Sequence, residues 1–312
     1  MFSIKSSPDW GAALEPPQQI RLSIVLLNFN RLDETRQTVE GLLAMAGDRP
    51  DIEIIAVDNN SVDGTAEYLE KQDGVRAVLL RENNGIAGYN KGFAMAAGDY
   101  ILVLDDDSCP RGAATLNRII ALLDENPEMG VLACHIETPA GAPQWKWHLP
   151  REHRFGISPF FIGCGFAIRR RLFEQIGWYP ENFFIYQNEI DVSFKVRMQG
   201  YEIYYDPECR VVHRGVPSQR PGRRCVYYPT RNTIWLIRRY YPLPAATYML
   251  LSRLLVGLGR AVYLRQMDAF RSAVRDGFSE PIDRRRPSRA ILRQAAPFFR
   301  QNSIVHQTAR MT

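Results

Sequence analysis

The sequence predicts an α/β fold: a doubly wound, mostly parallel (mixed) sheet with helices on both faces, followed by a C-terminal α-helical extension. Three observations support this prediction. Short apolar runs recur along the first third of the chain, each run ends in a polar turn, and segments with helical spacing separate the runs. Strand, turn and helix repeated in this order are typical of a parallel sheet with helices packed on both faces.

Four apolar runs are expected to form the first strands of this sheet. They are LSIVLL (22–27), IEIIAV (52–57), VRAVLL (75–80) and YILVL (100–104). After the first run, apolar and small side chains follow helical spacing at Leu32, Thr35, Val39, Leu42 and Leu43. Ligands of such sheets bind beyond the carboxyl ends of the strands. Here those ends carry the polar residues Asn28, Asn30, Asp58, Asn60, Asn83 and Asp105–Asp107.

Asp105, Asp106 and Asp107 follow the fourth run directly, where a buried strand reaches the surface. Neighbouring carboxylates repel one another, and desolvating even one is costly without a partner. Three consecutive aspartates exceed what a helix cap requires, although Asp is favoured there. A bound cation would compensate this cluster.

Composition narrows the class of protein. The 312 residues are 46% hydrophobic and 23% charged, which suits one large α/β domain or two smaller units. Five cysteines without a CxxC pair favour reduced thiols and not a zinc site. The N-terminus lacks the pattern of a signal peptide, so a cytoplasmic location is expected. Neither a GxGxxG after the first strand nor a GxxxxGK[ST] occurs, which disfavours dinucleotide dehydrogenases and P-loop NTPases.

The net charge of +5 hides a division between the two parts of the chain. From Arg210 onward, 20 arginines against four acids give +16, so the preceding residues carry −11. Segment 248–265 is apolar but carries Arg253 and Arg260, so we expect an amphipathic helix and no transmembrane span. Such a helix, with the basic run at 284–289, fits an anionic membrane surface. Packing on the body of the protein or on a second subunit of a homo-oligomer is the alternative. No nucleic-acid recognition motif is present, so nucleic acid is not expected as a partner.

Four longer segments occur in a fixed order. They are LSIVLLNFN, IEIIAVDNNSVDGT, ENNGIAGYNKGFAMAAGDYILVLDDD and GCGFAIRRRLFEQIGWYPENFFIYQNEIDVSFKVRMQGYEIYYDPECRVVHRG. Together they resemble the inverting family 2 glycosyltransferases of the GT-A fold, in particular the rhamnosyltransferase-like and galactofuranosyltransferase-like branch. The resemblance implies an N-terminal tail (1–20), a catalytic domain (21–225, with a nucleotide-binding half 21–107 and an acceptor half 108–225) and a basic helical region (226–312).

The resemblance assigns a role to each polar cluster. Asp105–Asp107 is expected to be a DxD-type motif that holds Mg²⁺ or Mn²⁺ through Asp105 and Asp107, with His213 as a further ligand. The metal would neutralise the diphosphate of a nucleotide-sugar donor. The nucleotide would be bound by Asn28, Asn30, Asp58, Asn60, Asn83, Gly85, Asn90, Asp105 and Asp106. Asp58 has an alternative role, because DNNS can form an Asx-turn.

The catalytic base is expected in FFIYQNEIDVS (183–193). An inverting transfer needs a carboxylate that accepts the proton of the acceptor hydroxyl. The family pattern is FFxYxEDxDL, so Asn188 replaces its first acid, Glu189 occupies the position of the base, and Asp191 matches the final Asp. Glu189 is the preferred candidate and Asp191 the second.

The implied function is transfer of a single sugar, from dTDP-rhamnose or a UDP-hexose, to a saccharide or a lipid-linked glycan in bacterial surface polysaccharide assembly. Two alternatives stay open. One is transfer to a polyprenyl phosphate. The other is a non-catalytic protein that binds sugar nucleotides or acts as a scaffold, which Asn188 in place of an acid would suit.

Overall fold

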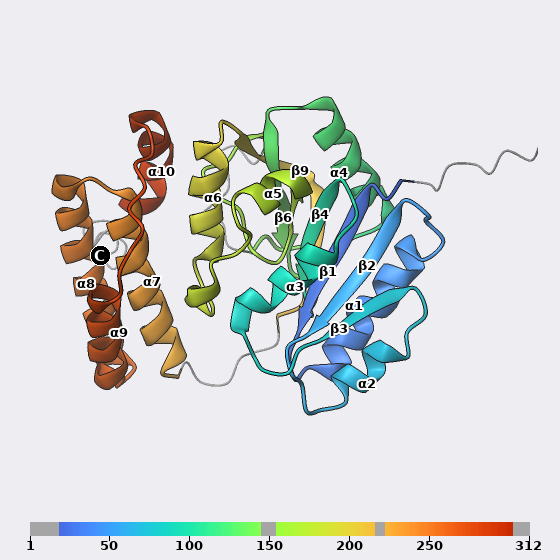
Figure 1. The fold of residues 1–312 in the computed structure, drawn as a ribbon, viewed down its shortest axis with the longest axis horizontal. Helices are drawn as coiled ribbons and strands as arrows, with labels where there is room; N and C mark the ends of the chain where they lie inside the picture. The colour runs from blue at the N-terminus through green and yellow to red at the C-terminus, as the bar shows by residue number, and fades with distance from the viewer. Residues whose placement is uncertain (1–18, 145–153, 216–221, 302–312) are drawn as a thin grey trace, which may run out of the picture.

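The computed structural model describes residues 19–144, 154–215 and 222–301 (Figure 1). Its sheet contains the strands β1 (Leu22–Asn28), β2 (Ile52–Asp58), β3 (Val75–Leu79), β4 (Tyr100–Asp105), β5 (Ser108–Pro110), β6 (Met129–Glu137), β7 (Gly156–Ile157), β8 (Phe166–Arg169) and β9 (Glu202–His213). Its helices are α1 (Leu32–Ala46), α2 (Thr65–Glu70), α3 (Tyr89–Met95), α4 (Ala113–Glu125), α5 (Arg170–Gln175), α6 (Asn188–Met198), α7 (Arg224–Tyr240), α8 (Leu243–Tyr263), α9 (Met267–Ser279) and α10 (Arg289–Gln301), with short 3₁₀ turns at Gly85–Gly88 and Glu181–Phe183.

The strands form one mixed sheet in the order β3-β2-β1-β4-β8-β6-β9-β5, with β7 beside β9. β1 runs parallel to β2 and β4, and β2 runs parallel to β3. The sheet becomes mixed at β8, which is antiparallel to both of its neighbours, β4 and β6. The first four strands lie within one residue of the predicted apolar runs, and the predicted fold class is confirmed.

Helices cover both faces of this sheet because the strand side chains alternate between two cores. Ile24 and Leu26 of β1 are buried in the core that includes Leu42 of α1. Val25, between them, is buried in the core that includes Phe93 of α3 and helices α5 and α6. Because both faces are buried, the strands read as continuous apolar runs.

The C-terminal helices α7 to α10 lie together beside α6, at the end of the molecule away from β3 (Figure 1). Phe194 of α6 and Trp235 of α7 are buried in one cluster with Ala295 of α10. The predicted helical extension is therefore present. The tail 1–20 lies mostly outside the described residues, and the division at residue 225 stays a prediction.

Helix α8 corresponds to the apolar segment that we expected to be amphipathic. By length and composition alone α8 could cross a membrane. Only 17% of its most apolar window is buried in the structure, so most of that window is at least partly exposed. Ala261 of α8 is buried in one cluster with Val226 of α7 and Ala269 of α9.

Candidate active site

The carboxyl ends of three parallel strands meet at one edge of the sheet. In the strand register, Asn28 pairs with Asp58, and Leu27 pairs with Asp105. A cavity of about 530 Å³ opens beside this edge. One part of its lining, the strand-end wall, consists of Asn59, Asn83, Gly85, Tyr89, Asp105 and Asp106. A second part, the loop wall, consists of Phe184, Ile185, Tyr186, Asn188 and Glu189.

Asp105 and Asp106 are the carboxylates of the strand-end wall. The Tyr89 hydroxyl donates to Asp105 Oδ1 over 2.8 Å. Burial, and next the charge of Asp107, raise the pKa of Asp105. Burial raises the pKa of Asp106 to about 8, although Arg31 opposes that shift. Both groups would release protons more readily if a cation bound beside them.

Arg31 is a partner of the aspartate cluster that sequence reasoning missed. Its guanidinium lies 2.8 Å from Asp106 Oδ1 and 2.9 Å from Asp107 Oδ2. A protein cation therefore compensates part of the negative charge that the sequence assigned to a metal alone. Arg31 lies three residues after the end of β1, but the sequence carries no signal that this side chain reaches Asp106 and Asp107.

His213, at the end of β9, lies beside the cluster, with Nε2 at 3.3 Å from Asp107 Oδ1. Its Nδ1 is 3.0 Å from Gln144 Oε1, while Gln144 Nε2 donates to the His213 carbonyl. The hydrogen bond from Gln144 Nε2 to the His213 carbonyl fixes the orientation of the Gln144 side-chain amide. Gln144 Oε1 therefore faces His213 Nδ1 and accepts the proton that Nδ1 carries. His213 Nε2 faces Asp107 Oδ1, so whenever Nε2 carries no proton both atoms are acceptors, and a metal ion could satisfy them.

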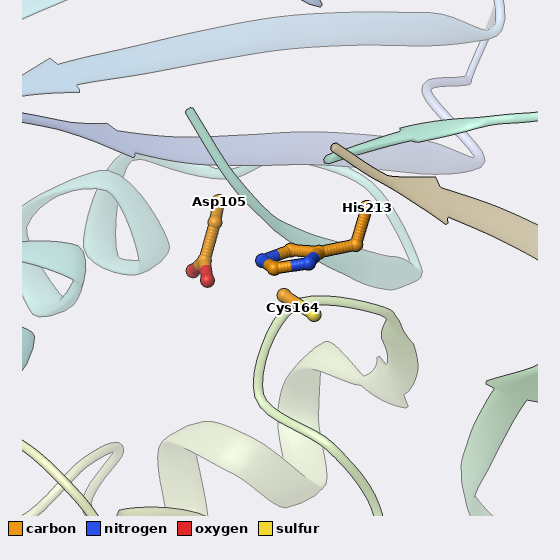
Figure 2. A group of neighbouring side chains, drawn as sticks. All are labelled: Asp105, Cys164 and His213. Carbon is orange, nitrogen blue, oxygen red and sulfur yellow. The ribbon is translucent and has the colours of Figure 1, made fainter. Parts of the chain in front are cut away.

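Asp105, Cys164 and His213 come together although they are far apart in sequence (Figure 2). Each offers one ligand atom, and these atoms all lie within 4.8 Å of one another. Carboxylate oxygen and imidazole nitrogen suit Mn²⁺ and, less well, Mg²⁺, whereas a thiol suits softer metals. Burial raises the pKa of Cys164 well above its usual value, so its sulfur stays protonated. The carboxylates and His213 thus fit the expected metal, and Cys164 is a neighbour.

The other predicted nucleotide residues fall into two groups. Asn83 and Gly85 line the cavity, together with Asn59, which sequence reasoning missed. Asn59 Nδ2 donates to Asn83 Oδ1 and to the Gly85 carbonyl, so this buried amide shapes the wall. The DNNS turn holds two adjacent asparagines, and the sequence carries no signal that singles out Asn59.

Four predicted asparagines are not among the residues that line the cavity, and their contact with a nucleotide stays a prediction. Asn28 Nδ2 donates to the Val57 carbonyl, and Asn90 exchanges two hydrogen bonds with the Tyr179 backbone. Asn30 accepts from the amide of Val62. The fourth, Asn60, is an exposed turn residue with φ of 67°. The side chains of Asn28, Asn30 and Asn90 thus support the backbone around the site.

Asp58 also lies outside the cavity lining and is 1% exposed. Its Oδ2 accepts from the Ser61 amide, so the alternative Asx-turn role is the one observed. Its Oδ1 is buried without a hydrogen-bond partner within the described part of the chain. Asp58 therefore stabilises the turn that follows β2, and its contact with a nucleotide stays a prediction.

Glu189 and Asp191 differ although both lie in the first turn of α6. Glu189 lines the cavity, and burial raises its pKa to about 7. Asp191 is fully buried, with ion pairs to Lys195 (2.9 Å) and Arg239 (2.6 Å) and a hydrogen bond from the Tyr240 hydroxyl. Burial alone would raise the pKa of Asp191, but Lys195 and Arg239 lower it. The carboxylate of Asp191 is enclosed between α6 and α7, which favours Glu189 as the base, and both assignments stay predictions.

The loop wall has an unusual backbone. Three residues have a positive backbone angle φ, which residues other than glycine rarely adopt: Phe184 (61°), Tyr186 (70°) and Gln187 (65°). Gly85, itself at φ of 57°, approaches so closely that a Cβ there would overlap the Phe184 carbonyl oxygen. The same oxygen accepts from the Ile86 amide, so the two walls meet at this point.

Side chains of helix α7 fix the backbone of this loop by hydrogen bonds to its carbonyls. Asn232 is fully buried, and its Nδ2 lies 2.9–3.1 Å from the carbonyls of Phe183, Ile185 and Tyr186. Arg231 donates to the Phe183 carbonyl as well. Sequence reasoning noted the segment RNTIW but assigned no role to Asn232. A polar residue within an otherwise apolar helical face was the available signal.

A comparison with known protein families gives a match over the part of the chain that includes the strand-end wall. Residues 23–177 match the family model described as glycosyl transferase family 2. The chain carries a glycosyl transferase family 2 domain. Outside this matched segment lie Glu189, His213 and Asn232, which the fold brings to the cavity or to the loop behind it.

Relatives of the family 2 domain include two bacterial proteins. "Probable glycosyltransferase YdaM" of Bacillus subtilis is 26% identical over 215 residues, 60% of this chain and 49% of the relative. The chain thus spans about half the length of that protein. "N-acetylglucosaminyl-diphospho-decaprenol L-rhamnosyltransferase" of Mycobacterium tuberculosis is 23% identical over 218 residues, 56% of this chain and 70% of the relative.

A solved structure shows the fold. The mannosyltransferase PcManGT from Pyrobaculum calidifontis, in complex with GDP-Man and Mn²⁺, superposes with a TM-score of 0.57 at 18% identity. The match covers 96% of this chain and 86% of that protein. The family 2 domain therefore has the expected GT-A fold.

Proposed function

We propose that this protein is an inverting, metal-dependent glycosyltransferase that moves a single sugar from a nucleotide-diphosphate donor to a saccharide or a lipid-linked glycan. One observation carries the proposal: a single cavity is lined by Asp105 and Asp106 and also by Glu189, whose pKa burial raises to about 7. A carboxylate with a pKa near the working pH is suited to general base catalysis.

The residues would divide the reaction as follows. Asp105, Asp107 and His213 would hold Mg²⁺ or Mn²⁺, with Gln144 orienting the His213 ring. When bound, the metal supplies positive charge to the departing nucleotide diphosphate. Glu189 would accept the proton of the acceptor hydroxyl as that oxygen bonds to the anomeric carbon and the carbon–phosphate oxygen bond breaks. One attack from the face opposite the leaving group inverts the anomeric centre.

The donor and setting are proposed from the relatives. A rhamnosyltransferase among them supports dTDP-rhamnose, with a UDP-hexose as the alternative, and surface polysaccharide assembly in the bacterial cytoplasm. Residues 21–225 would form the catalytic unit and 226–312 a basic helical region. A homo-oligomer and transfer to polyprenyl phosphate stay predictions of the sequence.

Calorimetric titration with dTDP-, UDP- and GDP-sugars, with and without Mn²⁺, tests the proposal. The wild-type protein should bind one nucleotide class in a metal-dependent manner, and Asp105→Asn should lose that binding. Asp268→Asn, at a carboxylate that is 91% exposed on α9, is the matched control and should bind normally. Failure of the wild-type protein to bind any of these donors with Mn²⁺ present would overturn the proposal.

A further inference from the structure

A second cavity lies in the C-terminal helical region. It measures about 760 Å³ and is enclosed by the end of α7, the first turns of α8 and the segment 284–292. It shares no lining residue with the cavity beside the strand ends. Six arginines line it and no acidic residue does: Arg238, Arg239, Arg284, Arg285, Arg286 and Arg289.

Most of this positive charge is uncompensated. Arg239 is paired with Asp191, and Arg285 is 3.2 Å from Asp283. Among the described residues, Arg284, Arg286 and Arg289 form no ion pair, and all three are exposed. Burial, and next the like charge of Arg284, lower the pKa of Arg238. The cavity also adjoins the N-terminus of α10, whose dipole favours negative charge. An anion with several acceptor oxygens fits these donors.

The same cavity has an apolar side, and α8, which lines it, carries further apolar residues on its exposed surface. Its lining includes Leu250, Phe278 and Leu292, and also Leu243, which is 70% exposed. A separate apolar stripe runs along another, exposed face of α8, through Tyr248, Leu251, Leu255 and Val262, with the spacing of a helical face. A free phosphate would use only the arginines, whereas a phospholipid would use both features.

We propose that the Arg-lined cavity and the exposed stripe of α8 form a docking surface for an anionic phospholipid bilayer. Headgroup phosphates would enter the cavity, and the stripe would lie at the boundary between headgroups and acyl chains. The helix lies on the membrane and does not span it, because its other side packs against α7 and α9. The proposal does not rest on glycosyl transfer and needs no nucleotide.

Vesicle flotation of the whole protein tests this surface. The wild-type protein should float with vesicles of phosphatidylglycerol and phosphatidylcholine, weakly with phosphatidylcholine alone, and less at high salt. The combined change Arg284→Gln, Arg286→Gln and Arg289→Gln should lower partitioning roughly 100-fold, at about fivefold per arginine near the surface. The matched control removes the exposed Arg36, Arg171 and Arg210, which lie outside the helical region, and should bind like the wild type.

A second variant tests the apolar stripe. Leu251→Gln with Leu255→Gln should reduce flotation while circular dichroism and the thermal unfolding midpoint stay unchanged, since both side chains are more than half exposed. Equal flotation of the wild type and the triple arginine variant would overturn the proposal. So would a dimer in sedimentation experiments that the leucine variant dissociates, because the stripe would then belong to a second copy. Inorganic phosphate that binds the cavity without vesicle flotation would also overturn it.

Discussion

The two walls of the active-site cavity are built in different ways. The strand-end wall is formed by residues at and after the ends of β2, β3 and β4, together with Tyr89 of α3, and its carboxylates stand at the end of the buried strand β4. The loop wall consists of an irregular segment at 184–186, whose backbone is held by Asn232 from α7, and of Asn188 and Glu189 at the start of α6. Parallel strands position the first wall, and a distant helix positions the second.

In our proposal, one wall of the cavity binds the donor and the other wall supplies the catalytic base. The strand-end wall carries the groups proposed for the metal and the nucleotide, and the loop wall leads into Glu189, the proposed base. Changes in the first wall should therefore weaken donor binding. Changes in the second should slow transfer while donor binding is retained.

Glu189→Gln should have the largest effect. It removes the proton acceptor but keeps the shape of the side chain, so the transfer rate should fall by about 10²–10⁴-fold. Single-turnover transfer and calorimetric donor binding measured on the same protein would check this. A parallel loss of donor affinity would show that Glu189 belongs to recognition and not to chemistry.

His213→Gln should weaken Mn²⁺-dependent nucleotide binding by on the order of 100-fold, and Gln144→Leu by roughly tenfold, within the range seen for groups that orient metal ligands. Electron paramagnetic resonance of free Mn²⁺ during titration would measure both. If the two variants bind Mn²⁺ with nucleotide as tightly as the wild type, His213 is not a metal ligand.

The strand-end wall could largely be predicted from the sequence, because carboxyl ends of parallel strands converge at one edge. Asn83, Gly85, Asp105 and Asp106 were found in this way. The side-chain partners were not predictable. Arg31 and Gln144 reach the cluster only through the fold, and nothing in the local pattern distinguishes Asn59 from Asn60.

The loop wall was predictable only at Glu189. Its strained backbone depends on Asn232, which is more than forty residues away along the chain. The different surroundings of Glu189 and Asp191 likewise depend on Lys195, Arg239 and Tyr240. Acids two residues apart in a helix look equivalent in sequence, and tertiary partners decide which is enclosed.

Asn232→Ala should affect the loop wall and not the strand-end wall, and its effect on transfer should be smaller than those of the changes above. Without its amide, buried carbonyls of the loop lose their donor, which costs roughly 1–3 kcal/mol of unfolding free energy for a group left unpaired. The transfer rate should fall about tenfold, since small misplacement of a catalytic group is costly. Chemical unfolding and the ratio of kcat to donor KM would measure this. An unchanged kcat with a raised donor KM would contradict the assignment of Asn232 to the loop wall.

Asp191→Asn should have the smallest effect on transfer. It leaves Lys195 and Arg239 buried without their anion, so stability should fall by about 3–5 kcal/mol. The rate per folded molecule should change only a few-fold. Urea unfolding with active-site titration would check this, and a loss as large as that of Glu189→Gln would favour Asp191 as the base.

The pH dependence of single-turnover transfer tests the central claim most directly. Glu189 must be ionised to accept a proton, and burial raises its pKa to about 7. The rate should therefore rise about tenfold per pH unit below pH 7 and level off above it, and this dependence should disappear in the residual activity of Glu189→Gln. A rate that is constant from acidic to neutral pH, or a profile that persists unchanged in Glu189→Gln, would contradict the account.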